Sequence, residues 1–159
     1  MSYQAVILTV SDSCAAGTRT DTSGPAIRAM LENAGFAVQA MQTVPDEEGQ
    51  ISAAIVHACD ILQADLVVTT GGTGLSARDV TPEATLAVLE REIRAIPVAM
   101  WVEGLKSTPR AMLSRAVAGI RGHTLVLNVP GSEKAARENL GAVVATLDHA
   151  LRMLAGGGH

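Results

Sequence analysis

Aromatic residues and positive charge are both scarce in this sequence. One tryptophan, one tyrosine and one phenylalanine occur among its 159 residues, and the formal net charge at pH 7 is −4. A protein that binds single-stranded nucleic acid needs aromatic side chains on which bases stack, and one that binds a duplex needs a basic surface. The composition therefore argues against a nucleic-acid partner.

The chain also has little of what zinc centres, disulfide frameworks and membrane spans require. Its two cysteines, Cys14 and Cys59, form no CxxC pair, and its four histidines show no HExxH spacing. This argues against a zinc site. Two isolated cysteines are typical of reduced thiols in a cytosol. No apolar run approaches the roughly 20 residues that a membrane helix needs. We therefore expect a cytoplasmic protein with no membrane partner.

Apolar segments, in contrast, make up much of the chain. Hydrophobic residues account for 48% of the sequence. A chain of this length can bury a full core without disulfides, so we expect a single domain over residues 1–159. Apolar runs predict buried strands over residues 4–10, 65–70 and 123–129, the first of them rich in β-branched residues, and residues 36–44 predict a further strand.

Helical spacing and capping residues separate these strands. They predict helices over residues 25–34, from Asp46 to Leu62, from Thr81 to about Arg91, and from a cap at Ser132 through Leu154. The pattern between residues 93 and 121 is the weakest in the chain, and it predicts a helix at 97–106, a break at Pro109 and one more helical turn at 111–114. We expect the glycine-rich tail, residues 156–159, to fray.

The alternation of strands and helices predicts an α/β fold of three layers, α/β/α, with a mostly parallel central sheet. In such sheets, ligands bind beyond the carboxyl ends of the strands. Here those ends lead into Ser11-Asp12, Pro45-Asp46, residues 71–74 and residues 130–132. The polar and glycine-rich motifs therefore collect at one edge of the sheet, which predicts a binding site there.

The run Gly71, Gly72, Thr73 and Gly74 follows the third predicted strand. Three glycines in four residues allow positive φ angles and can turn successive N–H groups toward one anion, most often a phosphate. A tight turn without a ligand explains the same residues equally well. The segment is not a P-loop, and its weak match to the dinucleotide motif lacks the helix that should follow directly.

Asp46 and Asp79 each lie just beyond a predicted strand at this edge. Mg²⁺ prefers a few carboxylate oxygens together with substrate phosphates and water, which two such aspartates would supply. Asp46 could instead be the N-cap of the helix that follows it. Asp79 could serve only to order its loop.

Two further motifs carry hydroxyl groups at the same edge. Ser11 and Asp12 could bind polar groups of a ligand or form a local turn. Pro130, Gly131 and Ser132 form a second possible anion site at a helix start, where Ser132 could also cap the helix. Positive charge for an anionic ligand could come from Lys106, Arg110 and Arg115, unless these are solvated surface residues.

Six motifs occur in order along the chain: Thr9-Val10-Ser11-Asp12, Pro45-Asp46-Glu47, Thr70-Gly71-Gly72-Thr73-Gly74, the segment from Arg78 to Thr85, Met112-Leu113-Ser114-Arg115, and Asn128-Val129-Pro130-Gly131-Ser132. Together they resemble the molybdopterin adenylyltransferase family of the MogA type, which also occurs as the G domain of plant and animal molybdenum-cofactor proteins. The resemblance covers nearly the whole chain.

The resemblance implies an enzyme of molybdenum cofactor biosynthesis. It implies transfer of AMP from Mg-ATP to the phosphate of molybdopterin, release of pyrophosphate, and hand-over of the product to a molybdate-inserting enzyme. It assigns catalysis and Mg²⁺ placement to Asp46 and Asp79, and it places residues 71–74, residues 130–132 and Ser114 around the nucleotide and pterin. It also implies a homotrimer.

Two other functions fit the same motifs. MoaB-like proteins share the glycine run and the Pro-Gly-Ser turn, so a non-catalytic or MoaB-like molybdopterin-binding protein is the main alternative. A nucleotide hydrolase on the same fold is the other. The residues Pro45-Asp46-Glu47 and Arg78-Asp79 favour the MogA type.

Overall fold

The computed structural model describes residues 2–157. Its strands are β1 (Gln4–Val10), β2 (Ala37–Val44), β3 (Leu66–Thr70), β4 (Arg91–Glu92), β5 (Ala118–Arg121) and β6 (Thr124–Val129). Its α-helices are α1 (Asp12–Ala15), α2 (Ser23–Asn33), α3 (Glu48–Val56), α4 (Thr81–Leu86), α5 (Ala95–Ser107) and α6 (Glu133–Leu154). A π-helical turn, η1 (His57–Ile61), extends α3, and a 3-10 turn, η2 (Pro109–Leu113), follows α5.

The strands form one sheet in the order β2-β1-β3-β6-β5-β4. The pairs β1–β2, β1–β3 and β3–β6 are parallel, whereas β5 and β4 pair antiparallel at one side. The chain moves from β1 to β2 in one direction and then crosses to β3 in the other. This reversal creates a topological switch point between β1 and β3, at whose carboxyl ends ligands bind in open α/β sheets.

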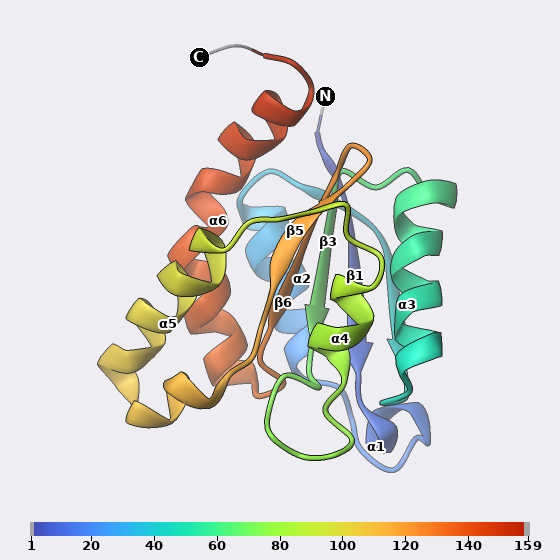
Figure 1. Cartoon of the computed structure of the whole chain (residues 1–159), viewed down its shortest axis with the longest axis vertical. Coiled ribbons are helices and arrows are strands. Elements are labelled where there is room, and N and C mark those ends of the chain that lie inside the picture. The colour runs from blue at the N-terminus through green and yellow to red at the C-terminus, as the bar shows by residue number, and fades with distance from the viewer. Residues whose placement is uncertain (1, 158–159) are drawn as a thin grey trace.

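Helices cover both faces of the sheet (Figure 1). One core lies between the sheet and α2, α5 and α6, and it contains Ile7, Ile27, Leu127 and Leu140. The other lies between the sheet and α3 and α4, where strand residues such as Leu8 and Val67 pack against helix residues. Adjacent residues of β1 and β6 enter opposite cores because side chains alternate across a strand. The predicted three-layer α/β/α fold is therefore confirmed.

The buried parallel strands and the long final helix agree with the sequence predictions. The strand boundaries differ from the predicted ones by at most one residue. Ser132 caps α6, because its side chain accepts a hydrogen bond from the N–H of Ala135. Gly35 ends α2 with a φ of 93°, and the N–H of Phe36 bonds back to the carbonyl of Leu31. That arrangement is a Schellman motif.

Several helix boundaries were predicted wrongly. Helix α2 begins two residues early, since the Asp21 carboxylate accepts a hydrogen bond from the N–H of Gly24 in its first turn. Helix α3 begins at Glu48, and Asp46 does not cap it. Helix α4 ends at Leu86 because Arg91 and Glu92 pair with β5 instead. The difference at α2 comes from a local capping contact, whereas those at α3 and α4 come from contacts with residues distant in the chain.

Besides β4, the short elements α1 and β5 were not predicted. The predicted loop after β1 contains the single turn α1, capped by the Ser11 side chain. The weakly patterned segment before residue 121 contains β5, which joins β6 through a tight turn at Gly122, where φ is 59°. At the other end, Gly156 and Gly157 close α6 by hydrogen bonds to Met153 and Arg152 rather than fraying. The rest of the predicted frayed tail lies outside the described residues.

Asn128 connects β6 to its neighbours in the interior. Its side-chain amide donates to the hydroxyls of Thr69 and Thr85, at 2.8 and 3.1 Å. Its side-chain oxygen accepts from the N–H of Val117 at 3.1 Å. Asn128 is fully buried, so every one of these groups would lose a partner if the amide were removed.

We therefore expect Asn128→Leu to lower the free energy of unfolding by about 1–3 kcal/mol, because it leaves the Val117 N–H buried without an acceptor. Urea denaturation measures the change. The matched control is Asn33→Leu, the same replacement at an exposed position of α2, which should change stability by less than about 0.5 kcal/mol. Equal effects of the two substitutions would contradict a structural role for Asn128.

Candidate functional site

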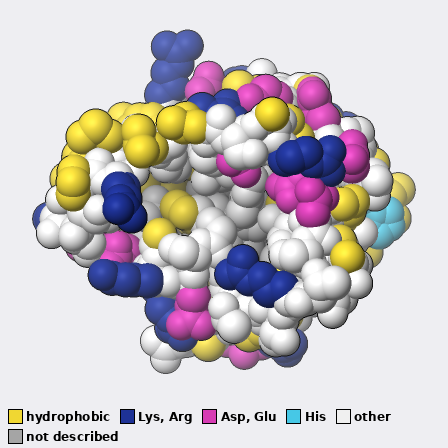
Figure 2. Space-filling model, turned by 90° about the horizontal axis from the view of Figure 1, so that it is seen from below, with side chains coloured by type: hydrophobic (Ala, Val, Ile, Leu, Met, Phe, Trp, Pro, Cys, Tyr) yellow, Lys and Arg dark blue, Asp and Glu magenta, His cyan; other side chains and the backbone are white. Residues whose placement is uncertain are grey.

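The carboxyl ends of the parallel strands form a hollowed edge of the molecule, which Figure 2 shows from below. Two cavities lie there, of about 340 and 490 Å³. Both volumes fall within the range of small-molecule sites. Gly72, Asp79, Gly131 and Ser132 line both cavities. They therefore form a shared wall between a first cleft, of 340 Å³, and a second cleft, of 490 Å³.

The structure brings together nearly all of the residues predicted for the site. Ser11, Asp46 and Gly71 line the first cleft. The second cleft is lined by Thr73, Gly74, Ser114 and Pro130. Asp12 lines neither cleft and instead contacts other protein groups beside them.

Glycine is required sterically at the start of the turn after β3. Gly71 and Gly72 have φ angles of 103° and 69°, in the left-handed region that favours glycine. A Cβ atom at Gly71 would collide with the carbonyl oxygen of Val10, and one at Gly72 would collide with the Thr81 hydroxyl. The turn therefore packs directly against the end of β1 and the start of α4.

The same turn has N–H groups to offer to a ligand. Gly71 donates its N–H to the carbonyl of Val129 at 3.2 Å. Within residues 2–157, by contrast, the N–H groups of Gly72, Thr73 and Gly74 have no protein acceptor. Three consecutive free amides beside two clefts are what an anion nest requires. The tight-turn and nest interpretations are thus compatible in this fold.

The Pro130–Ser132 turn lies against the glycine turn. A Cβ atom at Gly131 would be 3.2 Å from the Cα atom of Gly71, which shows how closely the two backbones approach. Helix α6 starts directly after Ser132 and has 22 residues. The positive end of its dipole therefore faces the shared wall and favours an anion there.

Asp46 and Asp79 have the same arrangement of carboxylate oxygens. The Oδ2 atom of Asp46 accepts the N–H of Asp12 at 2.9 Å, and the Oδ2 atom of Asp79 accepts the N–H of Ser76 at 3.0 Å. Neither Oδ1 atom has a protein donor within the described residues. In each aspartate, a backbone amide thus orients the carboxylate and leaves one oxygen free.

Burial raises the pKa of the Asp46 carboxyl, and the negative charges of Asp12 and Asp79 add to the rise. No cation forms an ion pair with Asp46 or Asp79 in the part of the chain that the structure describes. That part also contains no cluster of three or more His, Cys, Asp or Glu residues that could hold a metal by itself. A metal ion here would need further oxygens from a ligand or from water.

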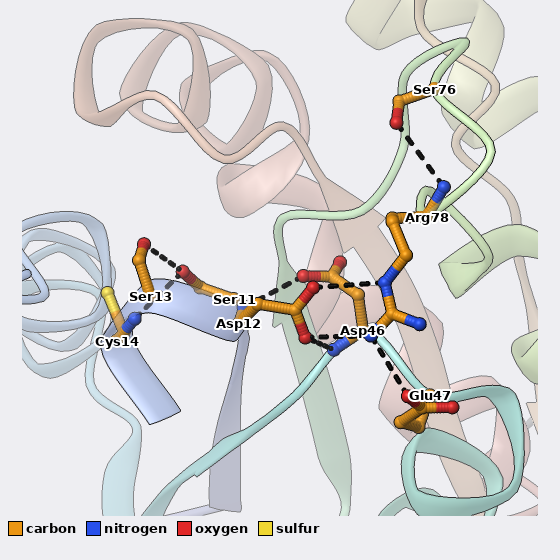
Figure 3. A network of polar contacts seen from close by, with 8 residues as sticks. All are labelled: Ser11, Asp12, Ser13, Cys14, Asp46, Glu47, Ser76 and Arg78. Atoms are coloured by element: carbon orange, nitrogen blue, oxygen red, sulfur yellow. Dashed lines mark hydrogen bonds and ion pairs between the residues drawn. The ribbon is translucent and has the colours of Figure 1, made fainter. Parts of the chain in front are cut away.

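Asp12 forms a reciprocal pair with Asp46, which Figure 3 shows. The N–H of Asp46 donates to Oδ1 of Asp12 at 2.9 Å, in return for the bond from Asp12 to Asp46. Arg78 donates to both oxygens of Asp12, at 3.0 and 3.1 Å, and these bonds lower the pKa of the Asp12 carboxyl. The Asp12 carboxylate is therefore occupied by protein donors.

Some basic residues beside the clefts bind other protein groups, and others remain available to a ligand. The Arg115 guanidinium contacts the carbonyls of Gly74 and Asp79 and pairs with Glu83, so it holds the glycine loop. Lys106 pairs with Glu103. The prediction that these two residues supply charge to a ligand is not supported by their contacts.

Nine of the twelve basic residues form ion pairs within residues 2–157. The other three are Arg19, Arg91 and Arg110. Arg19 lines the first cleft and Arg110 the second. Each cleft therefore has one guanidinium that no described carboxylate neutralises.

Sequence reasoning missed parts of both cleft walls. Asp21 and Ser23 line the first cleft, and Asn139 lines the second. The Thr9 hydroxyl donates to the Asp21 carboxylate at 2.7 Å, which holds the loop after α1 against β1. Asp21 and Ser23 lie in the polar, glycine-containing stretch between the first predicted strand and the next predicted helix, and a loop of that kind at the binding edge was the available signal. Asn139 is the seventh residue of α6, nearly two turns from its start, where only the fold reveals its position.

We expect Gly71→Ala to lower the free energy of unfolding by about 2–4 kcal/mol, because alanine adds both an unfavourable φ and a collision with Val10. Gly49→Ala is the matched control, since a Cβ atom in that first turn of α3 meets nothing within 4 Å. It should leave stability unchanged or raise it by up to about 1 kcal/mol. A Gly71→Ala protein as stable as the control would contradict the close backbone contact.

Among residues 2–157, no helix combines the length and the hydrophobicity needed to traverse a lipid bilayer.

Comparison with known proteins gives a consistent result. A family model described as a probable molybdopterin binding domain matches residues 6–149. Molybdopterin adenylyltransferases of Helicobacter pylori (strain J99) and Escherichia coli (strain K12) are each 38% identical to this chain. These alignments cover 94% and 86% of this chain, and 86% and 71% of those proteins.

Some relatives are much longer. The molybdenum cofactor synthesis protein cinnamon of Drosophila melanogaster is 40% identical over 149 residues, which are 93% of this chain and 25% of the fly protein. The chain thus spans about a quarter of the length of that curated relative.

Solved structures agree along nearly the full length. The molybdopterin biosynthesis enzyme MoaB of Thermus thermophilus is 48% identical, with a TM-score of 0.92 and 97% of each chain covered. A MogA structure is 40% identical, with a TM-score of 0.88, 95% of this chain and 99% of the other covered. Because the family model matches most of the sequence and these folds superpose from end to end, the chain belongs to the molybdenum cofactor biosynthesis family built on the probable molybdopterin binding domain.

Proposed function

We propose that this chain is a molybdopterin adenylyltransferase, which transfers AMP from Mg-ATP to the phosphate of molybdopterin and releases pyrophosphate. The observation that carries the proposal is the pair of aspartates at the shared wall. Asp46 and Asp79 each keep one oxygen free beside three unpaired backbone amides. The names of the bacterial relatives, molybdopterin adenylyltransferase, support the same activity.

The two aspartates fit a magnesium ion better than a metal of another class. Mg²⁺ is bound through one or two carboxylates, with phosphate oxygens and water completing its shell. Among the described residues, the first cleft has no histidine, and it offers the oriented carboxylates of Asp46 and Asp79. The carboxylate of Asp21, which also lines it, already accepts hydrogen bonds from Thr9 and Gly24. Burial of Asp46 without a paired cation also favours a ligand of positive charge. When bound, the ion would neutralise charge on the phosphates of ATP.

The two clefts suit the two substrates. Only the first is lined by both aspartates, so we assign the phosphates of ATP to it, with Arg19 at its rim. The second has a more apolar lining, with Ala111, Leu113 and Ala135, and we assign the pterin to it, with Arg110 for its phosphate. The reacting phosphates then meet at the wall formed by Gly72, Asp79, Gly131 and Ser132.

The transfer exchanges one bond to phosphorus for another. An oxygen of the molybdopterin phosphate forms a bond to the α-phosphorus of ATP. The bond from that phosphorus to the bridging oxygen breaks, and its electron pair leaves with pyrophosphate. The attacking phosphate is already anionic, so no proton needs to be removed.

The protein residues position the substrates and stabilise charge, as phosphoryl-type transfers require. The amides of Gly72, Thr73 and Gly74 and the N-terminus of α6 donate to phosphate oxygens. Such oriented donors need no reorganisation during the reaction. A transfer of this kind requires neither a nucleophilic cysteine nor a histidine base.

We further propose that the protein is a homotrimer, acts in the cytoplasm and passes its product to a molybdate-inserting enzyme. The free thiols of Cys14 and Cys59 are consistent with a reducing compartment. Val98, Val102 and Leu105 recur at helical spacing on α5 and are 45–56% exposed. Figure 2 shows hydrophobic side chains gathered at one side of the hollowed edge. Such a stripe suits an interface between copies.

We expect Asp79→Asn to reduce pyrophosphate release from Mg-ATP and molybdopterin by about 100-fold or more, as loss of a charge-stabilising group does. The asparagine oxygen can still accept the Ser76 N–H, so circular dichroism and urea denaturation should stay unchanged. Asp148→Asn, on an exposed turn of α6, is the control and should keep full turnover.

Three outcomes would redirect the proposal. Unchanged turnover in Asp79→Asn removes Asp79 from the mechanism. A wild-type protein that binds molybdopterin tightly without releasing pyrophosphate is a binding protein, as a MoaB-like function predicts. Breakdown of ATP without molybdopterin indicates a nucleotide hydrolase.

The trimer makes a separate prediction. Val102→Glu should convert a wild-type trimer into monomers in sedimentation velocity, because it places a charge in the apolar stripe of α5. Ile61→Glu is the control, since Ile61 is 69% exposed on the opposite layer, and it should remain trimeric. A wild-type protein that sediments as a monomer would overturn this part of the proposal.

A further inference from the structure

The loop that carries Asp79, residues 71–80, is fixed on the side of α4 and η2. The N–H of Arg115 donates to the Thr73 carbonyl at 2.8 Å, and its guanidinium reaches the carbonyls of Gly74 and Asp79 at 2.7 Å each. Thr81 binds the carbonyls of Gly71 and Gly72. These bonds hold the loop from one side only.

Arg78 holds the loop from the other side (Figure 3). Its guanidinium forms a fork with Asp12, with Nε on Oδ2 at 3.1 Å and Nη2 on Oδ1 at 3.0 Å. The same Nη2 atom is 2.9 Å from the Glu47 carboxylate. Within residues 2–157, these are the only polar side-chain bonds from the loop to the segments that follow β1 and β2.

Through Asp12, Arg78 is also connected to Asp46. Asp12 and Asp46 exchange two bonds of 2.9 Å between backbone N–H and carboxylate, which ties the ends of β1 and β2 together. One continuous set of hydrogen bonds thus runs from the Asp79 loop through Arg78 and Asp12 to the Asp46 carboxylate. Arg78 is the link between the two aspartates of the site.

We infer that Arg78 is a positioning residue for the proposed adenylyl transfer: its fork to Asp12 clamps the Asp79 loop against the ends of β1 and β2 and so fixes the spacing of Asp46 and Asp79. The inference rests on the proposed function. Arg78 lines neither cleft, so it acts through these residues rather than on a substrate.

The charges around Arg78 lead to the same conclusion. Asp12, Asp46, Glu47 and Asp79 lie around the end of the loop, and Arg78 is the only basic residue that pairs with any of them among the described residues. Without Arg78, these carboxylates would repel one another across the gap between the loop and the strand ends. The loop would then move away, and Asp79 would move with it.

Loss of the Arg78 ion pairs has different energetic consequences for catalysis and for the stability of the fold. About half of the Arg78 and Asp12 side chains is exposed, and exposed ion pairs contribute little to stability. A displacement of about 1 Å in a reacting group, in contrast, can cost about 100-fold in rate. Loss of Arg78 should therefore affect catalysis far more than folding.

The side chain also has to be an arginine. A guanidinium presents its donors in a rigid plane and can bind two carboxylate oxygens at once, whereas an ammonium is a single point charge. Lysine at this position would keep the charge and lose the fork. It should restore part of the function, because charge and geometry each contribute.

The test compares Arg78→Ala with Arg121→Ala. Arg121 forms a matching fork with Asp60, at 3.1 and 2.7 Å, and neither residue lines a cleft. We expect Arg78→Ala to lower kcat by about 100-fold and to raise the Mg²⁺ concentration needed for half-maximal rate, with the KM for molybdopterin changed less than twofold. The kcat of Arg78→Lys should lie between those of Arg78→Ala and wild type, and the kcat of Arg121→Ala should equal that of wild type.

A double substitution tests the route through Asp12. If Arg78 acts through that carboxylate, Arg78→Ala combined with Asp12→Asn should be no slower than Arg78→Ala alone. If the factors by which the two single substitutions lower kcat multiply in the double variant, Arg78 and Asp12 act independently and the clamp is rejected. Equal kcat and Mg²⁺ dependence in Arg78→Ala and Arg121→Ala would overturn it as well, while leaving the proposed function intact.

Hydrogen–deuterium exchange gives a readout that does not depend on activity. The N–H groups of Ser76 and Asp79 are hydrogen-bonded inside the loop, and they should exchange faster in Arg78→Ala than in Arg121→Ala or wild type. Absence of turnover in wild type rejects the proposed function, and the exchange result then decides the clamp alone. Unchanged exchange in Arg78→Ala rejects the clamp.

Discussion

Direct backbone contact between neighbouring strand ends is the constraint on which the rest of this site depends. Parallel pairing of β1, β3 and β6 brings the turns after these strands to one edge. Gly71 packs against the Val10 carbonyl and Gly131 against Gly71, with no room for side chains between them. Because the backbones approach so closely, amide groups and a helix N-terminus reach the same small volume, and phosphate-sized anions can be bound by backbone donors.

The charge distribution follows from this crowding. Negative side chains cluster beside an anion site, which is favourable only if cations intervene. Arg78 neutralises Asp12 and Glu47, whereas Asp46 and Asp79 have no paired cation among the described residues. Arg19 and Arg110, which pair with no carboxylate among residues 2–157 and line different clefts, offer charge to anionic ligands. The arrangement thus separates groups that satisfy one another from groups that remain available for substrate and metal.

The sequence predicted the four parallel strands, the long final helix and the edge where the site lies, because hydrophobic patterns and capping residues are local signals. It did not predict β5 or the end of α4, whose pairing depends on contacts distant in the chain. For Asp46, the sequence left two roles possible, that of a metal ligand and that of a helix N-cap. The cap is wrong, since Asp46 bonds to Asp12, while its part in metal binding and the choice between MogA and MoaB types stay predictions.

The sequence by itself determined the layered fold, the family and the residue types at the site, since glycines, aspartates and Pro-Gly-Ser turns lie where buried strands end. Only the tertiary structure decided how those residues divide their work. Asp12 and Arg115, which look like ligand-binding groups in the sequence, are used to hold loops in place. Arg19 becomes a cleft residue although no motif marks it. The physical reason is that a charged side chain is available to a ligand only if no nearby protein group satisfies it, and distance in the chain does not reveal which groups are near.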